Sequence, residues 1–415
     1  MRTRILFVAE AVSLAHVARP SVLANTLDTD EFEIHFASNG QFSICHTNDA
    51  FVHHRINSIA PQDFLRRLSA GSPLYTYGEL AAYIDEDRAL LDAVGAEIIV
   101  SDFRLSLAIS ARLSKIPLLN ICNGHWSPYV VGERLRAPDL AMARLIGYPL
   151  FDPIFRLAWP WASKLHVAAA NRLRRQYGLA PYRSLRELYC DGDISMYADT
   201  PALVRLSEAA SSSHLFIGPL IWSPEMPLPP WWPEVAGRSE PPIYITLGST
   251  GEVDLLPRIV DACRREGARC LVSTAGRGDF QASAPDVYTQ AFLPGSQAAA
   301  LSSLVICNGG SATAYQALAQ GCPVLGICSN LDQVMTMQGV AAAGAGEFMR
   351  AGEATLSRLR ESIRRMHSQR RYAERAQGIQ ASFASFDPNK LFPALVKDVR
   401  DRVGRKRQAP VLPLF

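Results

Sequence analysis

The chain has 415 residues, of which 48% are hydrophobic and 20% charged, and its formal net charge is +3. This length exceeds what one hydrophobic core usually serves, so we expect two domains. The near-balanced charge excludes the broad basic surface of a nucleic-acid-binding protein, and no apolar run is long enough to span a membrane.

The first half of the chain alternates short apolar runs with helical patterns. Strands are predicted at residues 4–11, 32–38, 97–102 and 117–122, and helices near 17–27 and 105–115. The apolar runs are continuous rather than alternating, which indicates strands buried on both faces, as in parallel sheets covered by helices. Glu10 interrupts the first run, so we interpret that segment as a buried strand and not as a signal peptide.

Two polar clusters in this half have a simple structural interpretation. Asp191-Gly192-Asp193 has the spacing of a metal-binding D-x-D motif, but it precedes an apolar run and is predicted to be a turn before a strand. The histidine-rich stretch 46–54 lacks a second cluster that would complete a ligand set. We therefore predict no metal site.

Eight cysteines are spread along the chain without a C-x-x-C pair. Several lie inside apolar runs, where a free cysteine behaves as a small buried hydrophobic residue. This pattern favours a cytoplasmic protein with reduced thiols.

A proline-rich stretch, residues 218–242, has almost no periodicity and is predicted to be a linker. After it come further apolar runs, predicted as strands at 242–249, 269–275, 286–292, 303–308 and 323–328. The predicted organisation is an α/β protein with domains at 1–217 and 243–385, followed by a helix and tail at 386–415. Ligands of doubly wound sheets bind outside the carboxyl ends of the strands, so the site is expected in the cleft between the domains.

The stretch "CNGGSATAYQALAQGCPVLGICSNLDQ", residues 307–333, combines several ligand-binding features. Gly309-Gly310 end a strand and precede a predicted helix, whose free N–H groups and positive dipole end suit a phosphate. Asp332 and Gln333 follow the next strand, where a carboxylate beside an amide can bind adjacent hydroxyls. A plain strand-to-helix turn and an Asp332 that only caps a helix at 333–343 remain the alternatives.

This stretch resembles the donor-site signature of the family 1 nucleotide-sugar glycosyltransferases, in the bacterial branch that is similar to macrolide glycosyltransferases. The resemblance extends over nearly the whole chain and is most specific in the second half. It implies the GT-B fold, in which two doubly wound Rossmann-like domains face a central cleft. It also implies a donor domain at the C-terminal side, an acceptor domain at the N-terminal side and a final helix that crosses back to the first domain.

By position, the resemblance implies a set of donor-binding residues. Gly248, Ser249 and Thr250 match a turn near the diphosphate, and Phe292 and Leu293 match contacts to the base. Phosphate contacts are implied for Asn308, Gly310, Ser311 and Thr313, ribose binding for Gln316, and sugar binding for Asp332 and Gln333.

Three positions depart from the family signature. Asn308 replaces a histidine, so a cationic contribution is lost although its amide can still donate a hydrogen bond. Gln316 replaces a glutamate and could hold ribose only without charge assistance. Gly295 replaces a common glutamine. These departures indicate a divergent member of the family.

His16 and Asp102 are the candidate catalytic pair. His16 follows the first predicted strand where a helix begins, and Asp102 ends a later strand. A neutral imidazole can deprotonate a hydroxyl, and a carboxylate can orient it and stabilise the imidazolium. The family uses such a pair, although Pro20 lies one residue further from the histidine than in the usual G-H-x-x-P. A lone histidine near a helix start can also be purely structural.

The predicted function is inverting transfer of a sugar from a UDP- or dTDP-sugar to a hydroxyl of a small, hydrophobic acceptor, with His16 as general base. Aromatic side chains in residues 124–190 line the acceptor pocket or form the core of the first domain. No cofactor or metal is expected. The alternatives are a GT-B epimerase and a non-catalytic relative that binds a nucleotide-sugar or a partner. Peripheral membrane contact through the basic final helix is a minor alternative, and a monomer and a homodimer both remain open.

Overall fold

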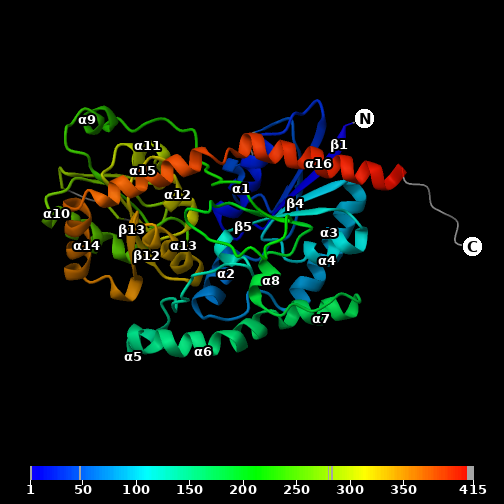
Figure 1. Ribbon diagram of the computed structural model, residues 1–415. Coiled ribbons are helices and arrows are strands. Elements are labelled where there is room, and N and C mark those ends of the chain that lie inside the picture. Colours follow the sequence, from blue (N-terminus) through cyan, green and yellow to red (C-terminus); the bar gives the residue numbers. More distant parts are fainter. Residues whose placement is uncertain (1, 46–47, 279, 282–283, 409–415) are drawn as a thin grey trace, which may run out of the picture.

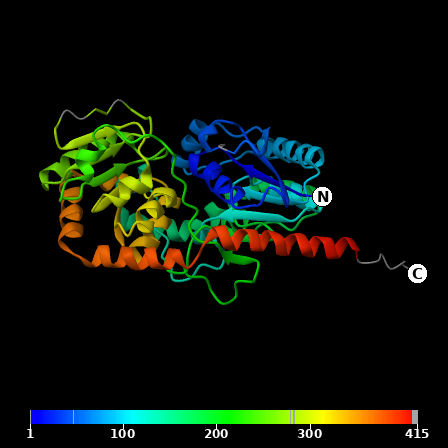
Figure 2. The same cartoon turned by 90° about the horizontal axis from the view of Figure 1, so that it is seen from above.

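Figure 1 shows the computed structural model, which describes residues 2–45, 48–278, 280–281 and 284–408. Residues 406–408 are described by their backbone alone. The chain forms two α/β lobes, which lie side by side in Figure 2. Each lobe is built on a sheet whose described pairings are all parallel. This confirms the predicted fold class.

The first sheet has the strand order β3-β2-β1-β4-β5-β6-β7. Its strands are β1 (Thr3–Ala9), β2 (Phe32–Ser38), β3 (Val52–Arg55), β4 (Ile98–Asp102), β5 (Leu118–Cys122), β6 (Ile194–Tyr197) and β7 (His214–Phe216). The order reverses between β1 and β4, and this topological switch point is where doubly wound sheets bind ligands.

The second sheet has the order β10-β9-β8-β11-β12-β13. Its strands are β8 (Ile243–Thr246), β9 (Cys270–Ser273), β10 (Val287–Gln290), β11 (Leu304–Cys307), β12 (Val324–Cys328) and β13 (Gly346–Arg350). Its switch point lies between β8 and β11, so each half of the chain offers one binding edge.

Helices cover both sheets. In the first half they are α1 (Leu14–Ala24), α2 (Pro61–Ser69), α3 (Tyr77–Val94), α4 (Leu107–Ser114), α5 (Ala141–Ile146), α6 (Tyr148–His166), α7 (Ala168–Gln176) and α8 (Leu185–Tyr189). In the second half they are α9 (Trp232–Ala236), α10 (Leu256–Arg265), α11 (Gly295–Ala300), α12 (Ser311–Ala319), α13 (Leu331–Ala342), α14 (Leu356–Ser368), α15 (Arg371–Ala384) and α16 (Pro388–Gln408). Short 3-10 turns lie at 43–45, 124–126, 253–255 and 351–353.

Helix α16 belongs to the packing of the first lobe although it ends the described chain (Figure 2). Phe392, Val396 and Val399 are buried in the same apolar cluster as β1 and α1. Burying each such side chain contributes about 1.5–3 kcal/mol. Lys397 and Arg400 add ion pairs to Glu31 at 2.7 and 3.1 Å.

The predicted apolar strands are confirmed, whereas short or half-exposed elements were missed. Strands β3, β7 and β13 gave no clear apolar run, and β3 is mostly exposed. The linker 218–242 contains the short helix α9. Asp193 accepts a hydrogen bond from the Leu118 amide at 2.8 Å immediately before β6, which confirms the predicted turn.

Glu10 is buried in an ion-pair network at the end of β1. Arg104 pairs with Glu10 at 2.9 Å and with Asp87 at 3.0 Å, and all three side chains are nearly inaccessible. Burial raises the pKa of both carboxyls, and the guanidinium opposes that rise. Glu10, whose charge argued against a signal peptide, is therefore fixed by this ion-pair network at the start of the loop between β1 and α1.

All eight cysteines are buried and unpaired, as their place in apolar runs predicted. Across the described ranges, no helix combines the length and apolarity that crossing a bilayer requires. Within the same ranges, no group of three or more His, Cys, Asp or Glu side chains could hold a metal ion. The histidine-rich stretch 46–54 lies partly outside the described residues, at positions 46 and 47.

Candidate functional site

One cavity of about 880 Å³ opens between the two lobes. Both switch points contribute to it. Asp102, which pairs with Ala9 in the first sheet, and Thr246, which pairs with Cys307 in the second, both line the cavity. The lining includes all fourteen predicted site residues, namely His16, Asp102, Gly248, Ser249, Thr250, Phe292, Leu293, Asn308, Gly310, Ser311, Thr313, Gln316, Asp332 and Gln333. The predicted residues therefore share one cavity.

His16 and Asp102 are in direct contact. The Nδ1 atom of His16 lies 2.7 Å from Oδ1 of Asp102, whose side chain is fully buried at the end of β4. His16 stands in the first turn of α1 and stacks on Phe103, with ring centroids 4.7 Å apart. When Nδ1–H donates to Asp102, Nε2 is the nitrogen left to accept a proton.

Arg19 is a third member of this cluster, one helical turn after His16. Its guanidinium donates to both Asp102 oxygens at 2.7 Å and to Oδ1 of Asn123 at 2.7 Å. Burial opposes the charged form of Arg19, but the adjacent carboxylate outweighs burial and raises its pKa. A bidentate pair of this kind fixes the carboxylate in place, and through it the imidazole.

The glycine-rich turn of the second lobe is held by Asn308. Its Oδ1 accepts from the Gly310 amide at 3.0 Å, and its Nδ2 donates to Oγ1 of Thr250 at 2.9 Å. Gly309 has a φ of +80°, and an added Cβ would lie 2.6 Å from Sγ of Cys328. Position 309 therefore requires glycine, because of both its backbone conformation and the lack of space for a side chain.

Helix α12 begins at Ser311, directly after this turn, with Gly310 as its N-cap. Gly310 offers no capping side chain, and Gly310, Ser311 and Thr313 line the cavity, so the start of the helix forms part of the cavity wall. The first N–H groups of a helix can donate to an anion. Gly248, with a φ of +56°, shapes the neighbouring 247–250 turn after β8.

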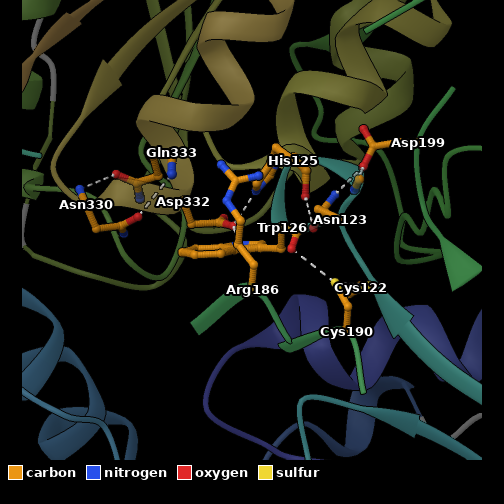
Figure 3. Close-up of polar contacts among 12 residues, drawn as sticks. Cys122, Asn123, His125, Trp126, Arg186, Cys190, Asp199, Asn330, Asp332 and Gln333 are labelled. Carbon is orange, nitrogen blue, oxygen red and sulfur yellow. Dashed lines mark hydrogen bonds and ion pairs between the residues drawn. The ribbon is translucent and has the colours of Figure 1, made fainter. Parts of the chain in front are cut away.

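Asp332 reaches across to the first lobe. Figure 3 shows His125 and Trp126 directed toward it, and their Nε2 and Nε1 atoms each lie 2.8 Å from its Oδ1. The alternative that Asp332 caps its helix is wrong, because the N-cap of α13 is Asn330. The side chain of Asp332 is 41% exposed, so the carboxylate remains accessible from the cavity.

Gln333 lies deeper than the sequence pattern indicated. Its Oε1 accepts from the amides of Ser329 and Asn330 at 2.8 and 3.2 Å, which completes the capping box of α13. Its Nε2 donates to Oγ1 of Thr250 at 3.2 Å. The amide therefore links the helix start to the 247–250 turn and is 2% exposed.

The ion pair between His125 and Asp332 predicts a pH-dependent stability. Burial alone would lower the pKa of His125, but the hydrogen bond and charge of Asp332 outweigh it and raise that pKa above 6.5. Burial opposes the shift in Asp332 too, yet His125, Trp126 and Arg19 lower its pKa from 3.8 to about 2.

A raised histidine pKa stabilises the fold fully below 6.5, and this contribution is lost as pH rises through the folded-state pKa. The Asp332 contribution is present above 3.8 and is lost as pH falls through about 2. We expect the melting temperature of His125→Gln to lie furthest below that of the wild type at about pH 5, and the difference to shrink toward alkaline pH. A difference that stays constant with pH would contradict this ion pair.

Gln316 and Gly295 fit together. The Nε2 of Gln316 donates to the Trp222 carbonyl at 2.5 Å, and a Cβ on Gly295 would lie 2.5 Å from its Oε1. The two departures from the family signature are therefore spatially matched, since the missing side chain at 295 makes room for the amide. Trp222 lies in the predicted linker and also lines the cavity.

This arrangement makes Gln316→Glu, the change to the family residue, unfavourable. A carboxylate cannot donate to the Trp222 carbonyl, so two acceptors would face each other. We expect a loss of stability of about 1 kcal/mol, measured by thermal denaturation. Gln377→Glu, at an exposed position inside α15, is the control for the same change of charge and should be close to neutral. An unchanged or raised stability of Gln316→Glu would count against the contact.

Phe292 and Leu293 occupy the far end of the cavity. The Phe292 ring is 49% exposed and lies over Gly276, where an added Cβ would be 3.3 Å from it. Leu293 is buried, so its side chain packs in the core of the lobe. An exposed ring at a cavity wall can stack on a planar group.

The opposite end of the cavity is apolar and lies in the first lobe. It is lined by side chains from α2, α6, α8 and the neighbouring loops, including Phe64, Leu74, Phe155, Trp159 and Leu185. Aromatic residues of 124–190 are found in both predicted environments, because Trp126 lines the cavity and also belongs to a buried cluster.

Five further residues of the site were not predicted from the sequence: Arg19, Asn123, His125, Trp126 and Trp222. Sequence signals could have identified Arg19 and Asn123. Arg19 is three residues after His16, on the same helix face, and Asn123 directly follows a buried strand. His125, Trp126 and Trp222 carry no such local signal, because their partners lie more than ninety positions away.

Comparison with known proteins identifies the family. Residues 269–397 match a family model described as the C-terminal domain of erythromycin biosynthesis protein CIII-like proteins. The chain is 37% identical to a PGL/p-HBAD biosynthesis rhamnosyltransferase of Mycobacterium bovis, over 97% of this chain and 86% of that protein. A PGL/p-HBAD biosynthesis glycosyltransferase of Mycobacterium tuberculosis is 36% identical, over 92% and 89%. An inactive PGL/p-HBAD biosynthesis glycosyltransferase of Mycobacterium bovis is 38% identical, over 64% and 72%.

Solved structures agree on the architecture. The spinosyn rhamnosyltransferase SpnG superposes with a TM-score of 0.68 at 16% identity, over 96% of this chain and 100% of that chain. SpnG has also been solved with thymidine diphosphate and with spinosyn aglycone. The calicheamicin glycosyltransferase CalG4 superposes with a TM-score of 0.67 at 16% identity, over 99% and 100%. The fold and the near full-length relatives together show that the chain is a glycosyltransferase and belongs to the bacterial, macrolide-type branch of family 1, with the GT-B fold.

Proposed function

We propose that this glycosyltransferase transfers a sugar with inversion from a nucleoside diphosphate sugar to a hydroxyl of a hydrophobic acceptor, with His16 as the general base. The observation that carries the proposal is the shared cavity, in which the His16–Asp102 pair of one lobe faces the glycine-rich turns of the other. A base on one side and phosphate donors on the other leave room between them for an acceptor hydroxyl and an anomeric carbon.

In this mechanism, Nε2 of His16 takes the proton of the acceptor hydroxyl as its oxygen attacks the anomeric carbon. Asp102 accepts from Nδ1 at 2.7 Å and stabilises the imidazolium that forms. Arg19 keeps the carboxylate oriented through its two hydrogen bonds. Because attack occurs opposite the leaving group, the new glycosidic bond has the opposite anomeric configuration from the donor.

The leaving nucleoside diphosphate would be stabilised by the second lobe. The free N–H groups at the start of α12 and around Ser249 offer hydrogen bonds and the positive end of a helix dipole. Asn308 can add its amide after leaving Thr250, to which it donates at 2.9 Å. Gln316 would contact the ribose, Phe292 the base, and Asp332 the sugar hydroxyls.

We propose that these groups make a divalent metal unnecessary. Main-chain donors and the helix dipole then supply the positive potential that a metal supplies in other phosphate sites. The transfer rate is expected to stay the same after addition of EDTA. A rate that falls with EDTA and returns with Mg²⁺ would contradict this proposal.

Rhamnose is the first sugar to test, with dTDP and UDP as carriers. A relative at 37% identity is named a rhamnosyltransferase, and a structural neighbour of that activity binds thymidine diphosphate. The apolar end of the cavity supports a lipophilic phenol or alcohol as acceptor.

The direct test is a thermal-shift panel of dTDP- and UDP-sugars, followed by transfer assays with the donor that binds. A ligand of the native state raises the melting temperature by mass action. The proposal predicts a shift with one donor, which His16→Ala retains, and product formation with a hydrophobic acceptor. No shift with any donor would support a non-catalytic relative, and conversion of the donor without an acceptor would support an epimerase.

A further inference from the structure

Helices α5 and α6 expose an unusually apolar surface, which we call the α6 face. It consists of Met142, Leu145, Leu150, Ile154, Leu157, Trp161 and Leu165. Leu145 is 80% exposed, Leu157 71% and Trp161 65%, so these side chains are not covered by the described part of the chain. Large contiguous apolar patches on a protein surface mark interaction sites.

The residue spacing shows that the α6 residues of this face lie on one side of the helix, which differs from the side that lines the cavity. Residues 150, 154, 157, 161 and 165 follow a three- and four-residue rhythm and so lie on one side of the helix. Phe155, Trp159, Ala162 and His166 lie on a different side and line the cavity. Helix α6 is therefore the wall between the apolar end of the cavity and the exterior.

The exposed charges that segment 134–190 itself contributes next to the α6 face have one sign. In the segment 134–190, exposed charged side chains are all basic: Arg134, Arg136, Arg144, Lys164, Arg172, Arg175 and Arg183. No exposed Asp or Glu occurs in that segment, and Asp139, Asp152 and Glu187 are partly buried and paired with arginines. From outside the segment, the exposed Glu252 pairs with Arg144 at 3.1 Å. An apolar face with a basic border complements a surface that is apolar inside and anionic outside.

We propose that the α6 face docks on a lipid bilayer that contains anionic lipids, with α6 lying in the plane of the interface. Trp161 would sit at the level of the headgroups, where tryptophan side chains concentrate. Lys164 follows it on the same edge of the helix and would contact lipid phosphates. This surface differs from the final helix α16, which lies at the opposite edge of the molecule in Figure 1.

A second copy of the chain fits this face less well. A symmetric dimer places the same patch on both subunits, so the basic border of one copy would face the basic border of the other. Anionic lipid headgroups instead neutralise that border. The charge pattern therefore selects the bilayer over self-association.

Docking would also place the acceptor end of the cavity one helix away from the lipid. This consequence rests on the proposed function, because it concerns a lipophilic acceptor. Such an acceptor would enter from the bilayer and present its hydroxyl toward His16, while the donor arrives from water on the other side of the cavity.

The test is co-sedimentation of the full chain with vesicles of phosphatidylcholine alone and of phosphatidylcholine mixed with phosphatidylglycerol. We expect binding to the anionic vesicles and little to the neutral ones. The double variant Leu157→Glu, Trp161→Glu should lower the partition coefficient by about tenfold or more. The charge variant Lys164→Glu, Arg175→Glu should lower binding to the anionic vesicles and leave the weak binding to neutral vesicles unchanged.

Leu391→Glu on α16 is the matched control, since Leu391 is an exposed leucine, 40% accessible, on the opposite edge, and it should bind as the wild type does. Equal melting temperatures would show that the variants fold. The proposal is overturned if no vesicle binds the wild type, or if the α6 variants bind as well as the control. It is also overturned if the wild type is a dimer that the α6 variants split, which would assign the face to a second copy. No sugar is present in this assay, so a failure of the proposed function leaves its outcome unaffected.

Discussion

His16→Ala is expected to lower kcat about a hundred- to ten-thousand-fold while donor binding stays within a few-fold of the wild type. The expected range is that of a positioned general base. Among the histidines that the structure describes, His16 alone combines a contact to a buried carboxylate, at 2.7 Å from Asp102, with a position on the cavity wall between the two lobes. Donor binding depends on the second lobe, so it should survive the substitution.

The measurement is a steady-state assay together with a donor thermal shift. His54→Ala is the matched control, because His54 lies on β3 outside the cavity lining and should leave kcat unchanged. A second variant, Asp102→Asn, should also reduce kcat strongly, since an amide does not stabilise the imidazolium as a carboxylate does. A His16→Ala enzyme with near-normal kcat would remove His16 from the mechanism.

Arg19→Met is expected to produce the largest loss of stability among the site variants, about 3–5 kcal/mol. The substitution leaves the fully buried Asp102 carboxylate without its bidentate partner, and an uncompensated buried charge is costly. The carboxylate would also lose its orientation toward His16, so kcat should fall even at temperatures where the variant stays folded. Urea unfolding and kinetics at low temperature measure the two effects.

Arg19→Lys separates charge from geometry, because lysine keeps the positive charge but cannot donate to both oxygens from a planar group. It should recover part of the stability and less of the activity. Arg172→Met, an exposed arginine on α7, is the control for loss of one positive charge. If Arg19→Met is as stable and active as this control, the role of Arg19 as a positioning residue is wrong.

The parts of the fold that could be predicted are those with a local signal. Strands such as β2 and β12 are uninterrupted apolar runs, and their burial on both faces follows from that pattern. His16 and Asp102 were predicted from their places at strand ends, since parallel strands bring such ends to one edge. The missed strand β3 is mostly exposed, so its residues give no apolar run.

The missed parts of the site depend on partners distant in sequence. His125 and Trp126 contact Asp332 across the cavity, and nothing near them in the chain indicates an acidic partner. Sugar binding by Gln333 stays a prediction, and the structure adds a second role, because its side-chain oxygen accepts from the amides of Ser329 and Asn330. A capping box uses the same residue types as a hydroxyl-binding pair, so the capping role of Gln333 could not be recognised from the sequence.

The departures at Gln316 and Gly295 were interpreted separately as signs of divergence. In the structure the two positions are neighbours, because the Gln316 amide fills the space that a side chain at position 295 would occupy. Asn308 likewise has a structural task, holding the glycine-rich turn through the Gly310 amide. Asn308, Gln316 and Gly295 therefore each have a structural role beside the cavity.

The most direct test of the account is the anomeric configuration of the product, determined by NMR after transfer from dTDP-rhamnose or the donor that the thermal-shift panel selects. The account predicts a glycoside whose configuration is opposite to that of the donor, formed by the wild type and nearly absent with His16→Ala. A product with the donor's own configuration, or equal amounts from both enzymes, would contradict direct displacement by a hydroxyl that His16 deprotonates.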